Sequence, residues 1–102
     1  MSTLHTVNKS PFEKNALQGC IGHLKQGDAV LMIEDGVVGA RKGSTAAAMV
    51  QTALASGGVY ALASDLAARG IKPEQLIDGV QTVDYGGFVD LVALHARTVA
   101  WL

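Results

Sequence analysis

Ala29-Val-Leu-Met-Ile33 is the most informative segment of this 102-residue sequence. It is a continuous apolar run between two groups of turn-forming residues, Gln26-Gly-Asp28 and Glu34-Asp-Gly36. A short strand that is apolar on both faces belongs inside a parallel sheet with helices on each side. We therefore predict a small three-layer α/β/α domain over residues 1–102, with a mostly parallel sheet of four to five strands.

A strand and a helix are predicted before this run. Thr3–Val7 is expected to form a short strand, and Ser10–Leu24 the first helix. Ser10 and Glu13 match a capping box, and Pro11 falls at the first helical position, where its missing N–H costs nothing. At 100° per residue, the apolar residues of this helix gather on one half of its surface: Phe12, Ala16, Leu17, Cys20, Ile21 and Leu24.

Strands and helices continue to alternate after the run. In chain order we predict a loop or short helical turn over 37–43, a helix over 44–55, a strand over 59–63, short helical segments over 66–69 and 73–77, a strand over 80–83, a helix over 85–96, and either a fifth strand or a partner-docking segment over 98–102. Ser44, Asp65 and Asp84 are expected as helix N-caps. Gln81 and Thr82 place their strand nearer an edge of the sheet.

The amino-acid composition argues for some kinds of binding partner and against others. Apolar residues make up 49% of the sequence and charged residues 17%, a high apolar share that favours contact with another subunit. The formal net charge of -1 gives no attraction for nucleic acid or for an anionic membrane. Because neither a signal-peptide pattern nor a bilayer-length apolar run is present, we expect a cytoplasmic protein.

The motifs of common cofactor and metal sites are missing. A single cysteine, Cys20, excludes an internal disulfide and a cysteine-based metal site within one chain. Lys42 precedes Gly43, which is the wrong order for a phosphate-binding loop, and no G-x-S-x-G elbow is present. The three histidines, His5, His23 and His95, do not have metal-ligand spacing. No cofactor and no metal are predicted.

Cys20 is the residue whose role the sequence leaves open. It lies near the middle of the apolar stripe of the first helix and near the helix C-terminus, where the helix dipole disfavours a thiolate. This position favours a buried, unreactive thiol. His23, three residues on, is within reach of Cys20 on a helix and is the nearby candidate for activating it.

Several blocks of the sequence resemble the DsrH/TusB family. They are Leu4–Phe12, Gly27–Gly36, Tyr60–Gly70 and Val83–Val92, followed by Trp101-Leu102. The blocks occur in the family's order and cover essentially the whole chain. The resemblance is strongest to the DsrH branch, and it implies a DsrE/F/H-like α/β fold.

The resemblance also implies a function. Family members are cytoplasmic subunits of a sulfur-relay complex in which a DsrH-like chain assembles with DsrE- and DsrF-like chains, two copies of each. Such a complex passes persulfide sulfur to a small acceptor protein, DsrC/TusE-like, in intracellular sulfur oxidation. TusB-like chains do the same with TusC and TusD, and there the sulfur ends in 2-thiouridine at the tRNA wobble position. Neither branch implies that this chain itself binds nucleic acid or a membrane.

Three roles are therefore open for this chain. The family's principal persulfide cysteine lies in the DsrE/TusD chain, but Cys20 matches a first-helix cysteine of DsrH-like chains and is a candidate secondary sulfur carrier. The second role is a purely structural subunit, with Trp101 as a core or interface anchor. The third, a stand-alone domain that binds a small ligand, has the least motif support.

Overall fold

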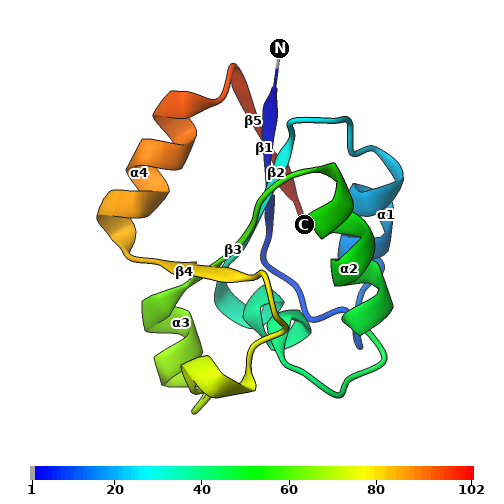
Figure 1. Ribbon diagram of the computed structural model, residues 1–102, viewed down its shortest axis with the longest axis vertical. Helices are drawn as coiled ribbons and strands as arrows, with labels where there is room; N and C mark the ends of the chain where they lie inside the picture. Colours follow the sequence, from blue (N-terminus) through cyan, green and yellow to red (C-terminus); the bar gives the residue numbers. More distant parts are fainter. Residues whose placement is uncertain (1) are drawn as a thin grey trace.

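A single parallel sheet organises residues 2–102, which are the residues that the computed structural model describes. Its five strands run in the order β4-β3-β2-β1-β5, and every neighbouring pair is parallel. Their bounds are β1 Thr3–Val7, β2 Ala29–Met32, β3 Val59–Leu62, β4 Gln81–Val83 and β5 Arg97–Trp101. The parallel α/β sheet is therefore confirmed, and the residues after 96 form the fifth strand rather than only a docking segment (Figure 1).

Helices cover both faces of the sheet. The α-helices are α1 Ala16–Gly22, α2 Ala47–Ser56, α3 Ala63–Ala68 and α4 Tyr85–Leu94, and the 3₁₀ helices are η1 Glu34–Ala40 and η2 Pro73–Gln75. In Figure 1, α1 and α2 lie on one side of the sheet and α4 on the other. The buried apolar residues form two clusters accordingly: a larger one that includes Leu17 of α1 and Val50 of α2, and a smaller one that includes Leu91 of α4.

β2 joins the two clusters. Val30 and Met32 contribute to the larger cluster, and Ala29 and Leu31 to the smaller one, as expected when successive side chains of a strand point to opposite faces. All four residues are at most 4% exposed. This confirms that β2 is an interior strand buried on both faces.

The two edges of the sheet differ in character. β4 is short, and Gln81 and Thr82 are exposed there, which confirms the predicted edge position. β5 forms the opposite edge and pairs with β1 so that Thr3 lies beside Arg97, and Val7 beside Trp101. The pairing with β1 therefore brings the indole of Trp101 next to the first strand.

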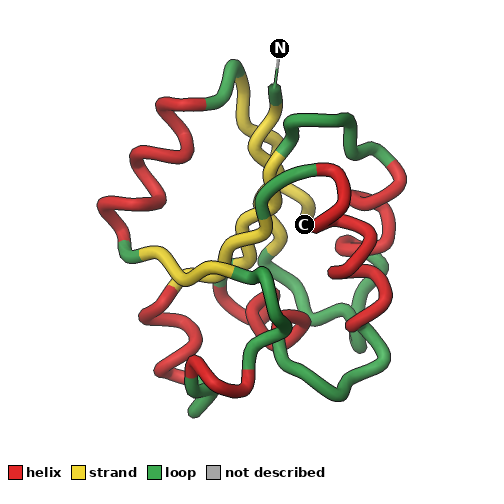
Figure 2. Tube along the Cα trace, viewed as in Figure 1, coloured by secondary structure: helices red, strands yellow, loops and turns green. Residues whose placement is uncertain are grey.

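The predicted start of the first helix is wrong. α1 begins at Ala16, and residues 11–13 form a turn (Figure 2). The Ser10 carbonyl accepts from the N–H groups of Glu13 and Lys14, and the Ser10 hydroxyl accepts from the N–H of Phe12, so these bonds close one turn instead of opening a helix. Phe12 is consequently 56% exposed and does not join the apolar face of α1.

The connections around η1 and α3 also differ from the prediction. The turn at 34–36 and the segment that follows it form one 3₁₀ helix, η1, in which a side chain at Gly36 would come within 2.1 Å of the Val7 carbonyl oxygen. α3 begins at Ala63, and Asp65 does not cap it. The carboxylate of Asp65 instead accepts from the N–H of Glu34, which has a left-handed φ of 50°.

The remaining helix boundaries lie close to the prediction. Asp84 is the N-cap of α4, and its Oδ1 accepts from the N–H of Gly87 at 2.8 Å, as predicted. The prediction of Ser44 as an N-cap is wrong: α2 begins at Ala47 with Ala46 as its N-cap, and the Ser44 hydroxyl accepts from the N–H of Ala46 in the turn before the helix. None of the helices formed by residues 2–102 combines the length and the apolar character needed to cross a bilayer.

Candidate functional site

Cys20 lies inside the larger apolar cluster. Its side chain is fully buried on α1, between the sheet and the helix layer. Burial, with a further contribution from the negative charge of Asp28, raises the pKa of the Cys20 thiol to about 12. The buried position predicted from the apolar stripe is confirmed, whereas sulfur transfer by Cys20 stays a prediction.

His23 lies at the C-terminus of α1 and is exposed. Its Nδ1 donates to the carbonyl oxygen of Gly19 at 2.9 Å, and its ring lies 5.2 Å from the indole of Trp101, centroid to centroid. The backbone N–H of His23 donates to the carbonyl oxygen of Cys20 at 2.9 Å, but within residues 2–102 no hydrogen bond joins the His23 ring to the Cys20 thiol. The structure thus brings His23 together with Trp101, and the hypothesis that it activates the thiol stays a prediction.

A buried network centres on His5 of β1. The Trp101 Nε1–H donates to His5 Nδ1 at 3.0 Å, and His5 Nε2 lies 3.0 Å from Asp28 Oδ2. An indole N–H is only a donor, so Nδ1 must be the acceptor and the ring proton resides on Nε2. His5 is therefore a neutral imidazole that donates to the carboxylate of Asp28.

Asp28 is the common acceptor of this network. It lies directly before β2, is 4% exposed, and also accepts from the backbone N–H groups of Thr3 at 2.9 Å and Lys25 at 3.2 Å. Burial alone raises the pKa of a carboxyl group, but the hydrogen bonds from His5, Thr3 and Lys25 outweigh it and hold the pKa of Asp28 below its ordinary value. The buried carboxylate is thus ionised, and both of its oxygens accept hydrogen bonds.

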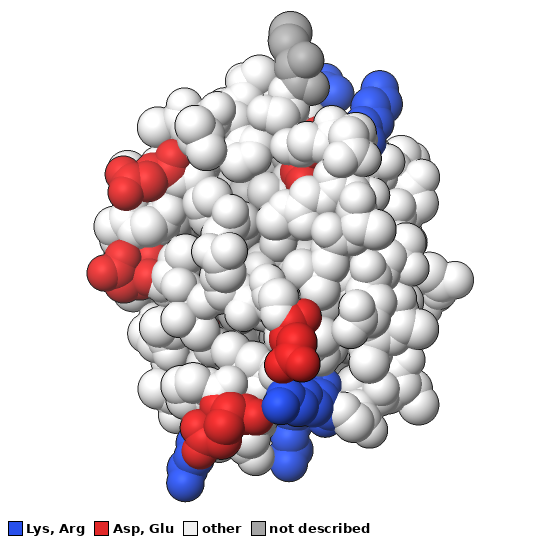
Figure 3. Space-filling view, in the orientation of Figure 1, with Lys and Arg blue, Asp and Glu red and all other residues white. Residues whose placement is uncertain are grey.

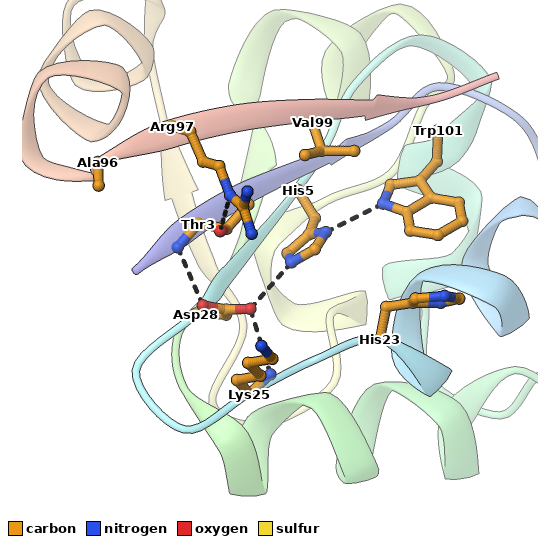
Figure 4. Close-up of a pocket in the computed structure, with 9 residues that line it drawn as sticks. All are labelled: Thr3, His5, His23, Lys25, Asp28, Ala96, Arg97, Val99 and Trp101. Carbon is orange, nitrogen blue, oxygen red and sulfur yellow. Dashed lines mark hydrogen bonds and ion pairs between the residues drawn. The ribbon is translucent and has the colours of Figure 1, made fainter. Parts of the chain in front are cut away.

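A pocket of about 830 Å³ opens beside this network. It lies between β1, β5 and the loop from α1 to β2, and Figure 4 shows Arg97, Lys25, His23 and Trp101 around it. The Nε–H of Arg97 donates to the hydroxyl of Thr3 at 3.0 Å, which fixes the direction of the guanidinium. Within residues 2–102, no group of three or more His, Cys, Asp or Glu side chains has the geometry of a metal site.

Sequence reasoning did not find this network. From the sequence, His5 is only a histidine without metal-ligand spacing, and Asp28 is only a turn-forming residue. One signal was available: a histidine in a short strand that faces the core needs a hydrogen-bonding partner. The partners themselves lie 23 and 96 residues away along the chain, so only the fold brings them together.

The acidic residues that follow the strands have structural roles. Arg69 of the segment after α3 pairs with the carboxylate of Asp35 at 2.8 Å and lies 3.8 Å from that of Asp65. Asp84 caps α4. The predicted capping role is confirmed for Asp84, whereas Asp65 accepts from the N–H of Glu34 and lies near Arg69 instead of capping a helix.

Comparison with known proteins identifies relatives over nearly the whole chain. The family model described as "DsrH like protein" matches residues 9–98. The chain is 34% identical over 99 residues to Protein TusB of Pectobacterium parmentieri and 36% identical over 101 residues to Protein TusB of Photorhabdus laumondii; each match covers 96% of this chain and 99% of the relative. Protein TusB of Shigella flexneri is 34% identical over 98 residues, with the same coverage.

Solved structures share the fold. The crystal structure of the ychN protein from E. coli superposes with a TM-score of 0.82, covers 98% of this chain and 99% of its own, and is 16% identical in sequence. A protein of unknown function from Methanobacterium thermoautotrophicum superposes with a TM-score of 0.74 at 16% identity, with 97% of both chains covered. These two likenesses concern the fold alone.

Proposed function

Because this chain belongs to the DsrH/TusB family, we propose that it is a subunit of a cytoplasmic sulfur-relay complex. The observation that carries the proposal is the family match, which extends over residues 9–98, together with relatives that align over 99% of their own length. The match over nearly the whole length of both chains supports a subunit of this type.

The TusB branch of the family is the better supported one. The relatives described above carry the name TusB at 34–36% identity. We therefore place the chain in the relay that supplies sulfur for 2-thiouridine at the tRNA wobble position. Sulfur oxidation through a DsrEFH-type complex is the second candidate, and the first-helix cysteine, Cys20, is the observation that favours it.

Within the complex, the chain acts mainly as a structural subunit. A thiol that accepts a persulfide sulfur needs access and a substantial thiolate fraction, and Cys20 is fully buried with a pKa raised to about 12. A role of Cys20 as a secondary carrier requires α1 to open in the assembly. The main persulfide chemistry is accordingly assigned to a paralogous chain.

The surface supports a subunit role. On α4, Tyr85, Val89 and Leu94 are 64%, 66% and 77% exposed. Apolar side chains exposed to this extent on one helix are typical of protein interfaces. On the face in Figure 3, most charged side chains lie toward the rim and much of the middle is uncharged. The proposed partners are two paralogous chains, TusC- and TusD-like, in a hexamer with two copies of each, and a small TusE-like acceptor protein.

Co-expression tests the assembly. The chain is produced with the two paralogous chains of its own organism, and the mass of the purified complex is measured by native mass spectrometry. We expect a hexamer for the unmodified chain and for Ala68→Lys, a matched control at an exposed position on α3, and loss of the complex for Val89→Lys and Leu94→Lys on α4. A chain that stays monomeric in the presence of both paralogues would contradict the proposal.

Sulfur transfer tests the division of roles. The assembled complex is supplied with a persulfide donor, and each chain is weighed by intact-mass analysis. We expect added sulfur on a paralogous chain, none on this chain, and full transfer to the acceptor with Cys20→Ser. A 32-Da adduct on Cys20 that is required for transfer would reverse the assignment and restore Cys20 as a carrier.

A further inference from the structure

The pocket beside the His5 network has no part in the proposed relay. Its volume of about 830 Å³ lies within the range of small-molecule sites, roughly 300–1,000 Å³. It is bounded by β1 and β5 on one side and by the loop that carries Lys25 on the other (Figure 4). Its walls therefore come from segments that the fold fixes by strand pairing and by the hydrogen bonds of Asp28.

The charged groups that face the pocket differ in whether they can still bind a ligand. Arg97 and Lys25 are cations, and within residues 2–102 neither takes part in an ion pair. Asp28 is the one carboxylate in the lining, but three N–H groups already occupy its two oxygens and it is 4% exposed. The pocket therefore presents two cations that are not ion-paired, whereas its one carboxylate is buried and already accepts three hydrogen bonds, and this charge balance favours an anion over a cation.

The cations are also oriented. The Nε–H of Arg97 is held by the Thr3 hydroxyl, which leaves the two terminal nitrogens of the guanidinium for another acceptor. A guanidinium fixed in this way is suited to bidentate contact with a carboxylate or phosphate group. The Lys25 side chain extends from the facing loop and supplies a second positive charge.

Two residues of β5, Val99 and Trp101, give one part of the pocket an apolar surface. Val99 of β5 is 36% exposed, and the indole of Trp101 lies beyond it along the same strand. A free inorganic anion would leave these surfaces in contact with water. An anion that carries an apolar group would cover them and gain the free energy of removing that surface from water.

We propose that this pocket binds a small organic oxyanion, a carboxylate or phosphate joined to an apolar group. The oxyanion lies between Arg97 and Lys25, and the apolar group lies on Val99 and Trp101. The sequence contains one tryptophan, so the resonance of the Trp101 indole N–H reports directly on the pocket.

The test is a titration of the full chain, followed by ¹H–¹⁵N NMR of that indole N–H. The probes are phenyl phosphate, benzoate, inorganic phosphate and the neutral benzyl alcohol. We expect a saturable shift with phenyl phosphate or benzoate, and at least tenfold weaker binding of inorganic phosphate and benzyl alcohol. The organic anion that binds more tightly shows whether the pocket prefers a phosphate or a carboxylate group.

Variants that remove single positive charges distinguish binding in the pocket from general attraction of an anion to the protein surface. Arg97→Gln and Lys25→Gln are each expected to weaken binding by about tenfold, the usual loss for one charge-assisted hydrogen bond. Arg41→Gln and Lys14→Gln remove the same charges at exposed positions outside the pocket and are expected to leave binding unchanged. Circular dichroism confirms that each variant is folded.

Three results would overturn the proposal: no saturable shift with either organic anion, equal binding of inorganic phosphate, or binding retained in both pocket variants. Assembly with the paralogous chains is measured separately. A failure here therefore leaves the proposed relay function standing, and a failure of assembly leaves this site standing.

Discussion

Asp28→Ala is expected to lower the free energy of unfolding by about 3–5 kcal/mol, the usual cost of removing one partner of a buried charged pair. Asp28 accepts from three donors: the backbone N–H groups of Thr3 and Lys25 and the Nε2–H of His5. Alanine leaves all three donors without their acceptor. His5 is affected most, because its ring is 4% exposed and its other nitrogen is already occupied by Trp101.

The magnitude follows from these donors. A buried donor left unpaired costs about 1–3 kcal/mol, so three independent losses would sum to roughly 3–9 kcal/mol. The losses are not independent, because the donors converge on one carboxylate and water can enter from the adjoining pocket, which favours the lower half of that range. A domain of this size has a total stability of about 5–15 kcal/mol, so the variant is expected to remain folded but marginal.

Urea unfolding, followed by Trp101 fluorescence and by circular dichroism, measures the effect. Asp78→Ala serves as the control, because Asp78 is an exposed aspartate in the turn before β4, and we expect it to change stability by less than about 0.5 kcal/mol. Asp28→Asn should fall between the two, since it retains an acceptor oxygen but directs an amide N–H at a donor. A loss below about 1 kcal/mol for Asp28→Ala would refute the assignment of Asp28 as the centre of a buried network.

Three further predictions concern pH, close packing and the thiol. Because folding lowers the pKa of Asp28, its stabilising contribution is complete above about pH 5 and is lost as the pH falls through the folded-state pKa. Urea unfolding measured over a series of acidic pH values should show this loss. Asp28→Asn should make the free energy of unfolding less dependent on pH. Gly36→Ala should lower the free energy of unfolding, measured in urea, by at least about 2 kcal/mol, because the added Cβ would lie 2.1 Å from the Val7 carbonyl oxygen. Gly22→Ala in α1 is the matched control: its Cβ meets no atom within 4 Å, so the change should be neutral or stabilising by up to about 1 kcal/mol. Cys20, with its pKa raised from 9.0 to about 12, should react with iodoacetamide at pH 8 at least about a hundredfold more slowly in the folded chain than in urea; equal rates would contradict its burial.

The fold was predictable where one local pattern sufficed. Four consecutive apolar residues in β2 can be buried together only in an interior strand, and the polar Gln81 and Thr82 of β4 are tolerated only near an edge. The start of α1 was not predictable in this way. The same capping pattern at Ser10 serves a single turn as well as a helix, and the contact of Pro11 with Gly39 of η1, which accompanies the turn, joins residues that are distant in the sequence.

The candidate site was predictable only in part, because its residues meet through strand order. Cys20 and His23 are near neighbours on one helix, so sequence spacing suggested that they interact. His5 and Trp101 are 96 residues apart and meet because β5 pairs with β1. Had the last strand been placed beside β4, the indole would face a different element and His5 would lack its donor. The sequence alone therefore indicated Cys20 as a candidate, whereas the hydrogen bonds of His5 with Asp28 and Trp101 became visible only from the order of the strands.

The network bears directly on what Cys20 can do. Persulfide chemistry at a buried thiol requires a positive charge nearby or an opening to solvent. The charged group that acts on the thiol is instead the carboxylate of Asp28, which adds to the effect of burial and raises the pKa of the Cys20 thiol further. The same carboxylate accepts from His5, which in turn accepts from the Trp101 indole that packs against Gly19 of α1. Exposure of Cys20 would have to separate α1 from the Trp101 indole that packs against Gly19, and for that reason the contribution of this chain to the proposed relay is more economically explained by its surfaces than by its thiol.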